Sequence, residues 1–405
     1  MEKDVLKGIK KNVFALGLVS FFTDISSEML YPIIPIFLTA VLGAPFAIVG
    51  LIEGVAESTA SILKVVSGWL SDRTGKRKPF VIYGYSLSAI SKPILALAYT
   101  WHFVLGARFL DRFGKGLRTS ARDALIADST DTQYRGKAFG FHRALDTMGA
   151  VIGPLLTLVL LFYLNGSYRL MFLVAFIPAI IGVILLVSFV SEKKSEKKDG
   201  LSFKLSDFNR EFKLFLAVSI IFAIGNSSNA FLILRARNVF ENFGGIPSII
   251  ASVFGSMAVL AVVILSYVVY NVTYSLASMP AGMLSDRFGR RNLIVGGFLI
   301  FSLVYLGFAL ANQGYEIWLL FAVYGFYIAM TDGVRTAFVV DMVPAEKRGT
   351  AIGIYNTAIG LMALSSSILA GLLWDRIGAG VCSFPARKCD GFYGCRAAGG
   401  AFAKT

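Results

Sequence analysis

The stretch "GWLSDRTGKRK" at residues 68–78 ends one long apolar run and precedes another. A near copy, "GMLSDRFGRRN", occupies the same kind of position at residues 282–292. Both copies keep Gly, Leu, Ser, Asp, Arg and a second Gly in one order and with closely similar spacing. Apolar segments often resemble one another by chance, but chance does not reproduce charged and glycine positions together. The pair therefore predicts a chain built from two related halves.

Hydrophobic residues make up 56% and charged residues 16% of the 405 residues, and the mean hydropathy is +0.69. Soluble globular proteins contain about 25% charged residues, and about 20 apolar residues cross the hydrocarbon core of a bilayer. The composition therefore predicts an all-α polytopic membrane protein. Eleven spans fit this length: 13–41, 46–70, 80–100, 102–127, 139–164, 169–190, 213–238, 260–284, 292–311, 316–340 and 353–377.

The formal net charge of +14 comes from lysines and arginines that cluster between the spans. Alternate loops are basic, whereas the loops between them, such as residues 42–46 and 311–316, contain neither lysine nor arginine. This positive-inside pattern predicts a multi-pass protein of the plasma (inner) membrane with a cytoplasmic N-terminus. Topology in the lipid bilayer explains the basic excess, so we expect no nucleic-acid partner. The basic clusters are at residues 3–11, 73–78, 135–137, 193–213, 287–291 and 347–348.

A second repeat follows later in each half. Residues 121–140 align with residues 334–353 at a constant offset of 213 positions. The first spans of the halves align at a shorter offset, so extra residues must lie near 244–259. We expect an N-terminal six-helix bundle at 1–190, a cytoplasmic linker at 191–212, a C-terminal bundle with five recognisable helices at 213–378 and an atypical tail at 379–405.

The paired motif resembles the signature of the major facilitator superfamily, found between its second and third helices and again between the eighth and ninth. Gly149, Gly153 and Pro154 in the fifth span resemble that superfamily's antiporter motif. "RFGKG" at residues 112–116 resembles its proton-coupling motif, with Lys where Gln is commoner. The resemblance covers residues 10–378. It implies two pseudo-symmetric six-helix bundles around a central site that opens alternately to each side of the membrane.

The family pattern requires a twelfth helix after Gly378, and the sequence departs from the pattern there. Residues 379–405 contain charges, glycines and all three cysteines, but no run of about 20 apolar residues. We expect the twelfth helix to be missing or replaced, as after a frameshift or a truncated reading. The spacing of the cysteines matches no zinc or redox pattern, so we assign them no chemistry.

In the paired motif an aspartate lies between two glycines at the end of a helix. The first glycine permits close helix packing, the aspartate can meet a helix N-terminus or an arginine, and the second glycine permits a tight turn. The resemblance implies that these latch residues hold the two halves together in one state and release them in the other. Alternatively, the basic cluster only fixes the orientation in the membrane. The latch residues are Gly68, Asp72, Arg73, Gly75, Gly282, Asp286, Arg287 and Gly289.

Ionisable side chains are concentrated in the first five spans, where acids and bases nearly balance. A charge inside a membrane is costly, so such residues pair with one another or face a cavity. We expect Asp24, Glu28 and Asp146 to carry protons, with Arg112 as the switching partner. A motion that makes and breaks such pairs takes up protons on one side and releases them on the other. Alternatively, most of these ions form fixed structural pairs.

The second half has polar uncharged and aromatic side chains where the first half has charges. Such residues suit an organic substrate with a large apolar part. Aromatic residues in membrane helices also face lipid or pack against one another, and this alternative stays open. The candidate substrate-binding residues of the two halves are Arg108, Asp111, Asn226, Asn229, Tyr270 and Tyr327.

These features predict a secondary active transporter that exports a small organic compound in exchange for protons, similar to multidrug-type members of the superfamily. One alternative is uptake of an anionic solute bound by Arg108, Arg112 and Arg118. Another is a non-transporting membrane receptor on the same fold. We find no nucleotide-binding motif, metal-ligand cluster or Ser-His-Asp arrangement, so we expect neither an enzyme nor an ATP-driven pump. We expect a monomer without cofactor or metal.

Overall fold

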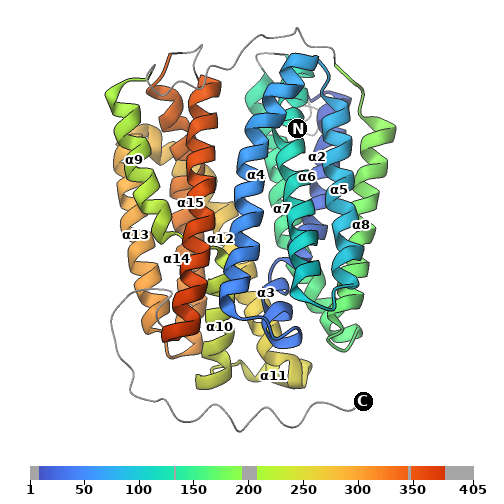
Figure 1. Cartoon of the computed structure of the whole chain (residues 1–405), viewed down its shortest axis with the longest axis vertical. Helices are drawn as coiled ribbons and strands as arrows, with labels where there is room; N and C mark the ends of the chain where they lie inside the picture. Colours follow the sequence, from blue (N-terminus) through green and yellow to red (C-terminus); the bar gives the residue numbers. More distant parts are fainter. Residues whose placement is uncertain (1–8, 132–133, 194–207, 345–347, 379–405) are drawn as a thin grey trace, which may run out of the picture.

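The computed structural model describes residues 9–131, 134–193, 208–344 and 348–378, with a few side chains, that of Asp286 among them, left out. In this part of the chain the regular structure is helical and contains no strand. The helices form two groups that lie side by side (Figure 1). The prediction of an all-α polytopic fold is confirmed. The tail at 379–405, with the expected loss of the twelfth helix, lies outside the described residues.

The first group contains the helices of the N-terminal half. Its first span is interrupted at Pro32, which has no N–H to donate to a helix. A short helix and a π-helix then complete this span. The elements are α2 (Lys11–Leu30), α3 (Ile34–Ile36), η1 (Phe37–Val41), α4 (Phe46–Thr74), α5 (Lys78–Ala96), α6 (Trp101–Asp128), α7 (Arg135–Tyr163) and α8 (Tyr168–Phe189).

The second group contains the helices of the C-terminal half. Its first span is interrupted between α9 and α10, and the hydroxyl of Ser228 caps α10 by accepting the N–H of Ala230. The short α11 and η4 lie where the repeat alignment predicts extra residues. The elements are α9 (Arg210–Gly225), α10 (Asn229–Phe243), α11 (Ser248–Phe254), η4 (Gly255–Met257), α12 (Ala258–Phe288), α13 (Arg290–Leu310), α14 (Gly314–Asp341) and α15 (Arg348–Ile377).

All eleven predicted spans are helical, and 9 of the described segments are long and apolar enough to cross a membrane. The two predicted spans outside this set are α5 and α6, whose sequences contain more polar residues. The charged side chains of α6 lie mostly inside the protein. A charged helix of this kind crosses a membrane only if neighbouring helices satisfy its side chains.

Each paired motif ends its helix at the second glycine. Gly75 follows α4 with φ of 66°, and Gly289 follows α12 with φ of 85°. Residues with a side chain rarely adopt such positive φ values, so the turn itself requires glycine at both positions. The chain then enters α5 and α13. We call the end of the molecule that carries these two turns the basic end.

The two halves meet along two helix pairs, α4 with α15 and α7 with α12. Between α4 and α15 the closest contacts lie at the end of the molecule opposite the basic end. A Cβ on Gly50 would collide with the backbone carbonyl of Ser367, and a Cβ on Gly371 would collide with the backbone of Phe46. Glycine at these positions therefore lets the two backbones approach each other.

A set of polar and aromatic contacts completes this closed end. The carboxylate of Asp375 accepts the N–H groups of Phe46 and Ala47 at 2.9 Å and 2.8 Å. The ring of Phe46 stacks on Trp374, with 4.7 Å between the centroids. Asp375 thus binds the free N–H groups at the start of α4, where the helix dipole favours a negative charge.

Candidate functional site

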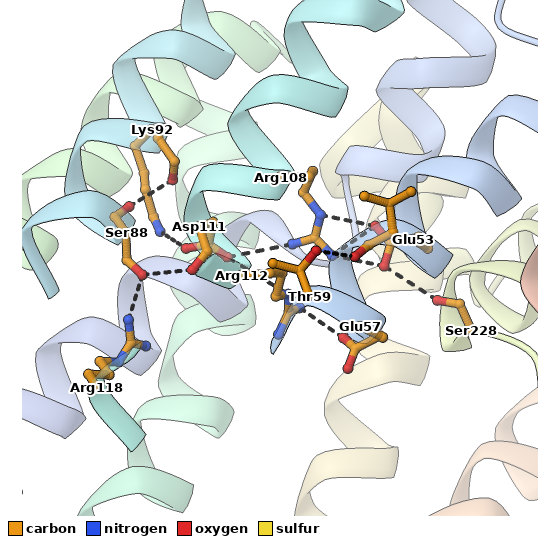
Figure 2. A network of polar contacts seen from close by, with 12 residues as sticks. Glu53, Glu57, Thr59, Ser88, Lys92, Arg108, Asp111, Arg112, Arg118 and Ser228 are labelled. Carbon is orange, nitrogen blue, oxygen red and sulfur yellow. Dashed lines mark hydrogen bonds and ion pairs between the residues drawn. The ribbon is translucent and has the colours of Figure 1, made fainter. Parts of the chain in front are cut away.

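A network of buried ion pairs occupies the interior of the N-terminal half (Figure 2). Its strongest pair joins α4 and α6. Arg108 donates three hydrogen bonds of 2.8 Å to 3.0 Å to the two carboxylate oxygens of Glu53. Both side chains are buried, 5% and 3% exposed. Ser228 of the other half also donates to Glu53, at 3.4 Å, so the pair lies at the boundary between the halves.

The other charged side chains of α6 in this network contact residues of α5 and α4. Lys92 donates to Asp111 at 2.8 Å, and both are buried. Arg112 lies 3.5 Å from Glu57 and 3.9 Å from Asp111. The pocket beside these groups has a volume of about 30 Å³, enough for roughly one water molecule. Arg108 and Asp111, which we predicted as substrate ligands, therefore lie beside a space too small for an organic substrate.

A larger cavity of about 350 Å³ lies between the two halves. It shares Arg143, Tyr274 and Asp332 with a second cavity of about 950 Å³ that continues past Gly282 to the basic end. The side chains of Arg143 and Asp332 are 57% and 55% exposed, so water reaches the centre of the molecule from this end. The charged lining residues of the central cavity are Asp24, Glu28, Lys64, Lys115, Arg118, Arg122, Arg143, Asp146 and Asp332.

Asp24 and Asp146 both line this cavity, and their carboxyl groups are close enough to influence each other's charge. Two ionised carboxylates at short range repel each other, so such a pair favours a proton on one of the two groups. Asp146 also accepts the hydroxyl of Ser20 at 2.6 Å and lies 3.5 Å from Arg143. Two of the three acids that we predicted as proton carriers are thus in direct contact.

The third acid, Glu28, connects the halves. It accepts the hydroxyl of Tyr267 on α12 at 2.8 Å. Nearby, Arg143 of α7 donates to the hydroxyl of Tyr274 and lies 3.6 Å from Asp332 of α14. The described residues place no arginine or lysine within 4 Å of Asp24 or Glu28, and Arg112 pairs with α4 instead. A change in the separation of the halves would break the bond to Tyr267.

Gly149 and Gly153 place α7 directly against α2. A Cβ on Gly149 would lie 2.6 Å from the carbonyl oxygen of Phe21 and 3.0 Å from the Cβ of Asp24. A Cβ on Gly153 would lie 2.7 Å from the carbonyl oxygen of Ile25. Pro154 follows inside the same helix. These glycines therefore set the helix separation at which Asp24 and Asp146 meet.

The described latch residues make their contacts within their own half in this conformation. Asp72 accepts a 2.5 Å bond from Arg77, and Gly68 packs against Ser120 of α6. Arg73 lies over the ring of Trp69 and Arg287 over that of Phe288. Gly282 lines the larger cavity, and the side chain of Asp286 lies outside the described residues.

Of the four substrate-binding candidates in the C-terminal half, Tyr270 lines the central cavity. Asn229 accepts the hydroxyl of Tyr324 at 2.7 Å, and Tyr327 is fully buried among aromatic rings. Asn226 ends α9, and its carbonyl accepts the hydroxyl of Ser366. Asn226, Asn229 and Tyr327 are absent from the described lining of the central cavity.

We assigned no site role to Tyr267, Tyr274, Lys64 and Lys115 from the sequence, although all of them line the cavity. The tyrosines were detectable, because Tyr267, Tyr270 and Tyr274 recur at helical spacing in "SYVVYNVTYS" and therefore share one face. Lys115 stands in the motif at residues 112–116, where the family more often has Gln, and no comparable signal marks Lys64. Among the described residues, no group of three or more His, Cys, Asp or Glu side chains is arranged to hold a metal.

Two helical halves around a polar cavity that is open at one end form the arrangement of a multi-pass membrane transporter. The chain belongs to the Major Facilitator Superfamily, whose profile matches residues 16–269 and 242–384. The resemblance that rests on the paired motif is therefore confirmed at the level of the superfamily.

Named relatives agree with this assignment. An uncharacterized MFS-type transporter of Methanocaldococcus jannaschii is 38% identical over 370 residues, 90% of this chain and 89% of that protein. The cis,cis-muconate transport protein of Acinetobacter baylyi is 27% identical over 329 residues, 76% of this chain and 77% of that one. A mutant of the nucleoside transporter NupG has a similar structure, with a TM-score of 0.71 at 14% identity over 92% of this chain and 95% of that chain.

Proposed function

We propose that this protein is a secondary active transporter that exports a small organic compound in exchange for protons by alternating access. The observation that carries the proposal is the Asp24–Asp146 carboxyl pair in a cavity open at the basic end. We assign the basic end to the cytoplasm from the positive-inside rule, which makes the described conformation inward-open.

In this proposal the units that move are residues 1–190 and 213–378, joined by the linker at 191–212. The closed end has glycine-mediated helix packing and the Asp375 contact, both of which must separate in an outward-open state. The basic end must then close, and the two turns at Gly75 and Gly289 approach each other. The latch residues act in that closed state, where Asp72 exchanges its contact with Arg77 for one across the halves.

Asp24 and Glu28 of α2, together with Asp146 of α7, couple proton movement to the movement of the halves. Asp24 and Asp146 share a proton while the cavity is open to the basic end. Glu28 is bound to Tyr267 of the other half, so separation of the halves deprives its carboxylate of a donor. A carboxylate that loses its hydrogen bond in a site of low polarity is stabilised by taking up a proton. Movement of the halves and movement of protons are thereby linked.

The nature of the substrate and the direction of transport have separate support. The muconate transport protein and a probable 4-methylmuconolactone transporter of Cupriavidus pinatubonensis are relatives named for small organic compounds. The motif at Gly149, Gly153 and Pro154 favours export. Uptake of an anionic solute is the second candidate, favoured by the basic side chains of the cavity. We place the protein in the inner membrane as a monomer.

The test is proton movement in vesicles reconstituted with the purified full chain. An imposed pH gradient is monitored after addition of cis,cis-muconate, uridine or ethidium, an anion, a neutral compound and a cation. We expect at least one compound to dissipate the gradient faster than in protein-free vesicles. Asp24→Asn and Glu28→Gln should each abolish the compound-dependent part of the proton flux.

The matched control is Asp123→Asn, which removes an acid of the same half that pairs with its neighbour Arg122 and is absent from the cavity lining. This variant should retain the wild-type flux. Coupled flux that survives in both Asp24→Asn and Glu28→Gln would refute proton coupling through α2. The direction of compound movement is compared with the direction of proton flow. Opposite directions indicate export in exchange for protons, and the same direction indicates uptake.

A further inference from the structure

Two lysines that line the central cavity have no ion-pair partner among the residues that the structure describes. Lys115 of α6 is exposed to the cavity, and Lys64 of α4 is partly exposed. Within the described part of the chain, no carboxylate oxygen lies within 4 Å of either ammonium group and neither donates a hydrogen bond to a side chain. Arg112 and Lys64 add to the positive charge around Lys115, while Glu57 and Asp24 lie at longer range. An unpaired cation in such a site has bonding capacity for an anion.

The arginines of the same region, in contrast, each lie next to a carboxylate or a hydroxyl of the protein. Arg108 is fully engaged by Glu53, and Arg112 lies near two carboxylates. Arg118 is buried, donates to Ser88 at 2.5 Å and lies 4.3 Å above the ring of Tyr85. The three arginines at which the sequence suggested an anion site therefore already have partners inside the protein. Among the described residues, Lys64 and Lys115 are the cations of the cavity lining that make no ion pair and donate no hydrogen bond to a side chain.

The opposite wall of the cavity has a different chemistry. Tyr267, Tyr270 and Tyr274 form a row along α12, with 5.4 Å and 6.4 Å between successive ring centroids. Between them lies Asn271, which is 5% exposed and whose amide nitrogen has no hydrogen-bond partner among the described residues. An unpaired buried amide is costly, so its presence beside a cavity points to a ligand that accepts its hydrogen bond. Tyrosine rings bind flat, unsaturated groups well.

We infer that the central cavity is a binding site for an organic carboxylate with a flat, unsaturated body. The carboxylate binds between Lys64 and Lys115, the flat body lies on the tyrosine row, and a second acceptor of the ligand meets Asn271. This inference rests on the proposed transport function and names the substrate class of the same cavity.

Equilibrium binding to the detergent-purified full chain tests the inference by isothermal titration calorimetry. The probes are cis,cis-muconate and 4-hydroxybenzoate, each compared with its uncharged methyl ester. We expect at least one carboxylate to bind with a Kd below about 10 mM. Its methyl ester should bind at least about tenfold more weakly. Lys115→Gln and Lys64→Gln should each weaken carboxylate binding about tenfold, because a charge-assisted bond is lost.

Two further variants keep the test decisive. Lys115→Arg restores the charge and should bind the carboxylate within about threefold of wild type. Arg237→Gln removes one positive charge from α10, where Arg237 pairs with Glu241 outside the cavity, and should leave the affinity unchanged. The inference is overturned if neither carboxylate binds, if the esters bind equally well, or if both lysine variants bind as wild type does.

This outcome is independent of the flux assay, because binding requires no gradient. Lysine-dependent carboxylate binding without any proton-coupled flux would refute the proposed function and leave the site in place. Proton-coupled flux of uridine or ethidium without carboxylate binding would refute the site and leave the proposed function in place.

Discussion

Arg108 and Lys115 are both cations of α6, about two turns apart, and they differ in surroundings and partners. Arg108 is buried and donates three hydrogen bonds to Glu53. Lys115 faces the cavity and has no acid within 4 Å in the described structure. The first arrangement allows a charged helix to lie inside a membrane protein, and the second leaves a charge for a ligand. Pairing thus separates structural charges from functional ones on a single helix.

The acids of the N-terminal half divide in the same way. Glu53 and Asp111 are buried against cations of α6 and α5. Asp24, Glu28 and Asp146 line the cavity, where Asp24 lies beside Asp146, Asp146 contacts Ser20 and Arg143, and Glu28 bonds to Tyr267 of the other half. Bonds inside one half persist when the halves move, whereas bonds between halves do not. We therefore expect Glu28, which is bonded to Tyr267 of the other half, to change its partner during transport, whereas the ion pairs of Glu53 and Asp111 inside the N-terminal half persist.

The largest expected effect comes from breaking the best pair of the buried group. Arg108→Gln leaves the carboxylate of Glu53 buried without its ionic partner. Removal of one member of a buried pair costs about 3–5 kcal/mol of unfolding free energy. We expect a correspondingly large drop in the unfolding temperature of the detergent-purified protein, measured by tryptophan fluorescence.

Lys115→Gln is the matched control, since it removes the same charge from the same helix. Because no partner is left unpaired, its unfolding free energy should change by no more than about 0.5 kcal/mol. The double variant Glu53→Gln/Arg108→Gln should recover part of the loss, because neutral amides replace both ions. Equal destabilisation by Arg108→Gln and Lys115→Gln would remove the distinction between the two groups.

The partners of these charges could be predicted from the sequence only in part. Depth along the helix axis follows from helix rise, and it places Arg112 near the level of Asp24. The structure pairs Arg112 with Glu57 because α6 lies between α4 and α5. Close glycine contacts set that position: a Cβ on Gly116 would lie 2.6 Å from Leu63, and one on Gly114 would collide with Gly84. Rotation about the helix axis depends on such packing and has no local signal.

Features with local causes were predictable. The turns at Gly75 and Gly289 need positive φ, which only glycine adopts readily, so the motif itself indicates them. The insertion that forms α11 follows from the change in repeat offset. The superfamily followed from the paired motif. The full set of residues that line the cavity could not be predicted in this way. The cavity combines residues of both halves, and contacts at the closed end set the relative position of the halves in this conformation.

A moderate effect is expected from moving the cavity acids without removing them. Gly149→Ala places a Cβ 2.6 Å from the carbonyl oxygen of Phe21, so α7 must retreat from α2. Overpacking of this kind costs about 1–3 kcal/mol. The retreat also lengthens the Asp24–Asp146 contact, so we expect weaker proton coupling in the vesicle assay in addition to a lower unfolding temperature.

Gly140→Ala controls for helix propensity on the same helix. A Cβ at Gly140 meets no atom within 4 Å, so this variant should be neutral or slightly stabilising, by at most about 1 kcal/mol. Both variants behaving alike would show that the spacing of α2 and α7 has no bearing on the acids.

The smallest expected effect concerns an exposed charge that nonetheless bridges the halves. Asp375→Asn removes the negative charge that binds the N–H groups of Phe46 and Ala47 at the start of α4. The effect of a charge at an exposed helix terminus is modest, so opening of the closed end should become about two- to fivefold more frequent. The pairing of Asp375 links moving halves, which places it with the functional charges despite its exposure.

Opening can be measured by the labelling rate of a cysteine at Ser367, which is 2% exposed and lies against Gly50 in the closed interface. The background carries Ser367→Cys with the 3 native cysteines replaced by serine. A bulky, membrane-impermeant maleimide should react two- to fivefold faster after Asp375→Asn, and at an unchanged rate after Arg376→Gln, the adjacent exposed position. An unchanged rate in Asp375→Asn would mean that helix packing at Gly50 and Gly371 alone keeps this end closed. A charge would then need both burial and a partner to affect the opening of the halves.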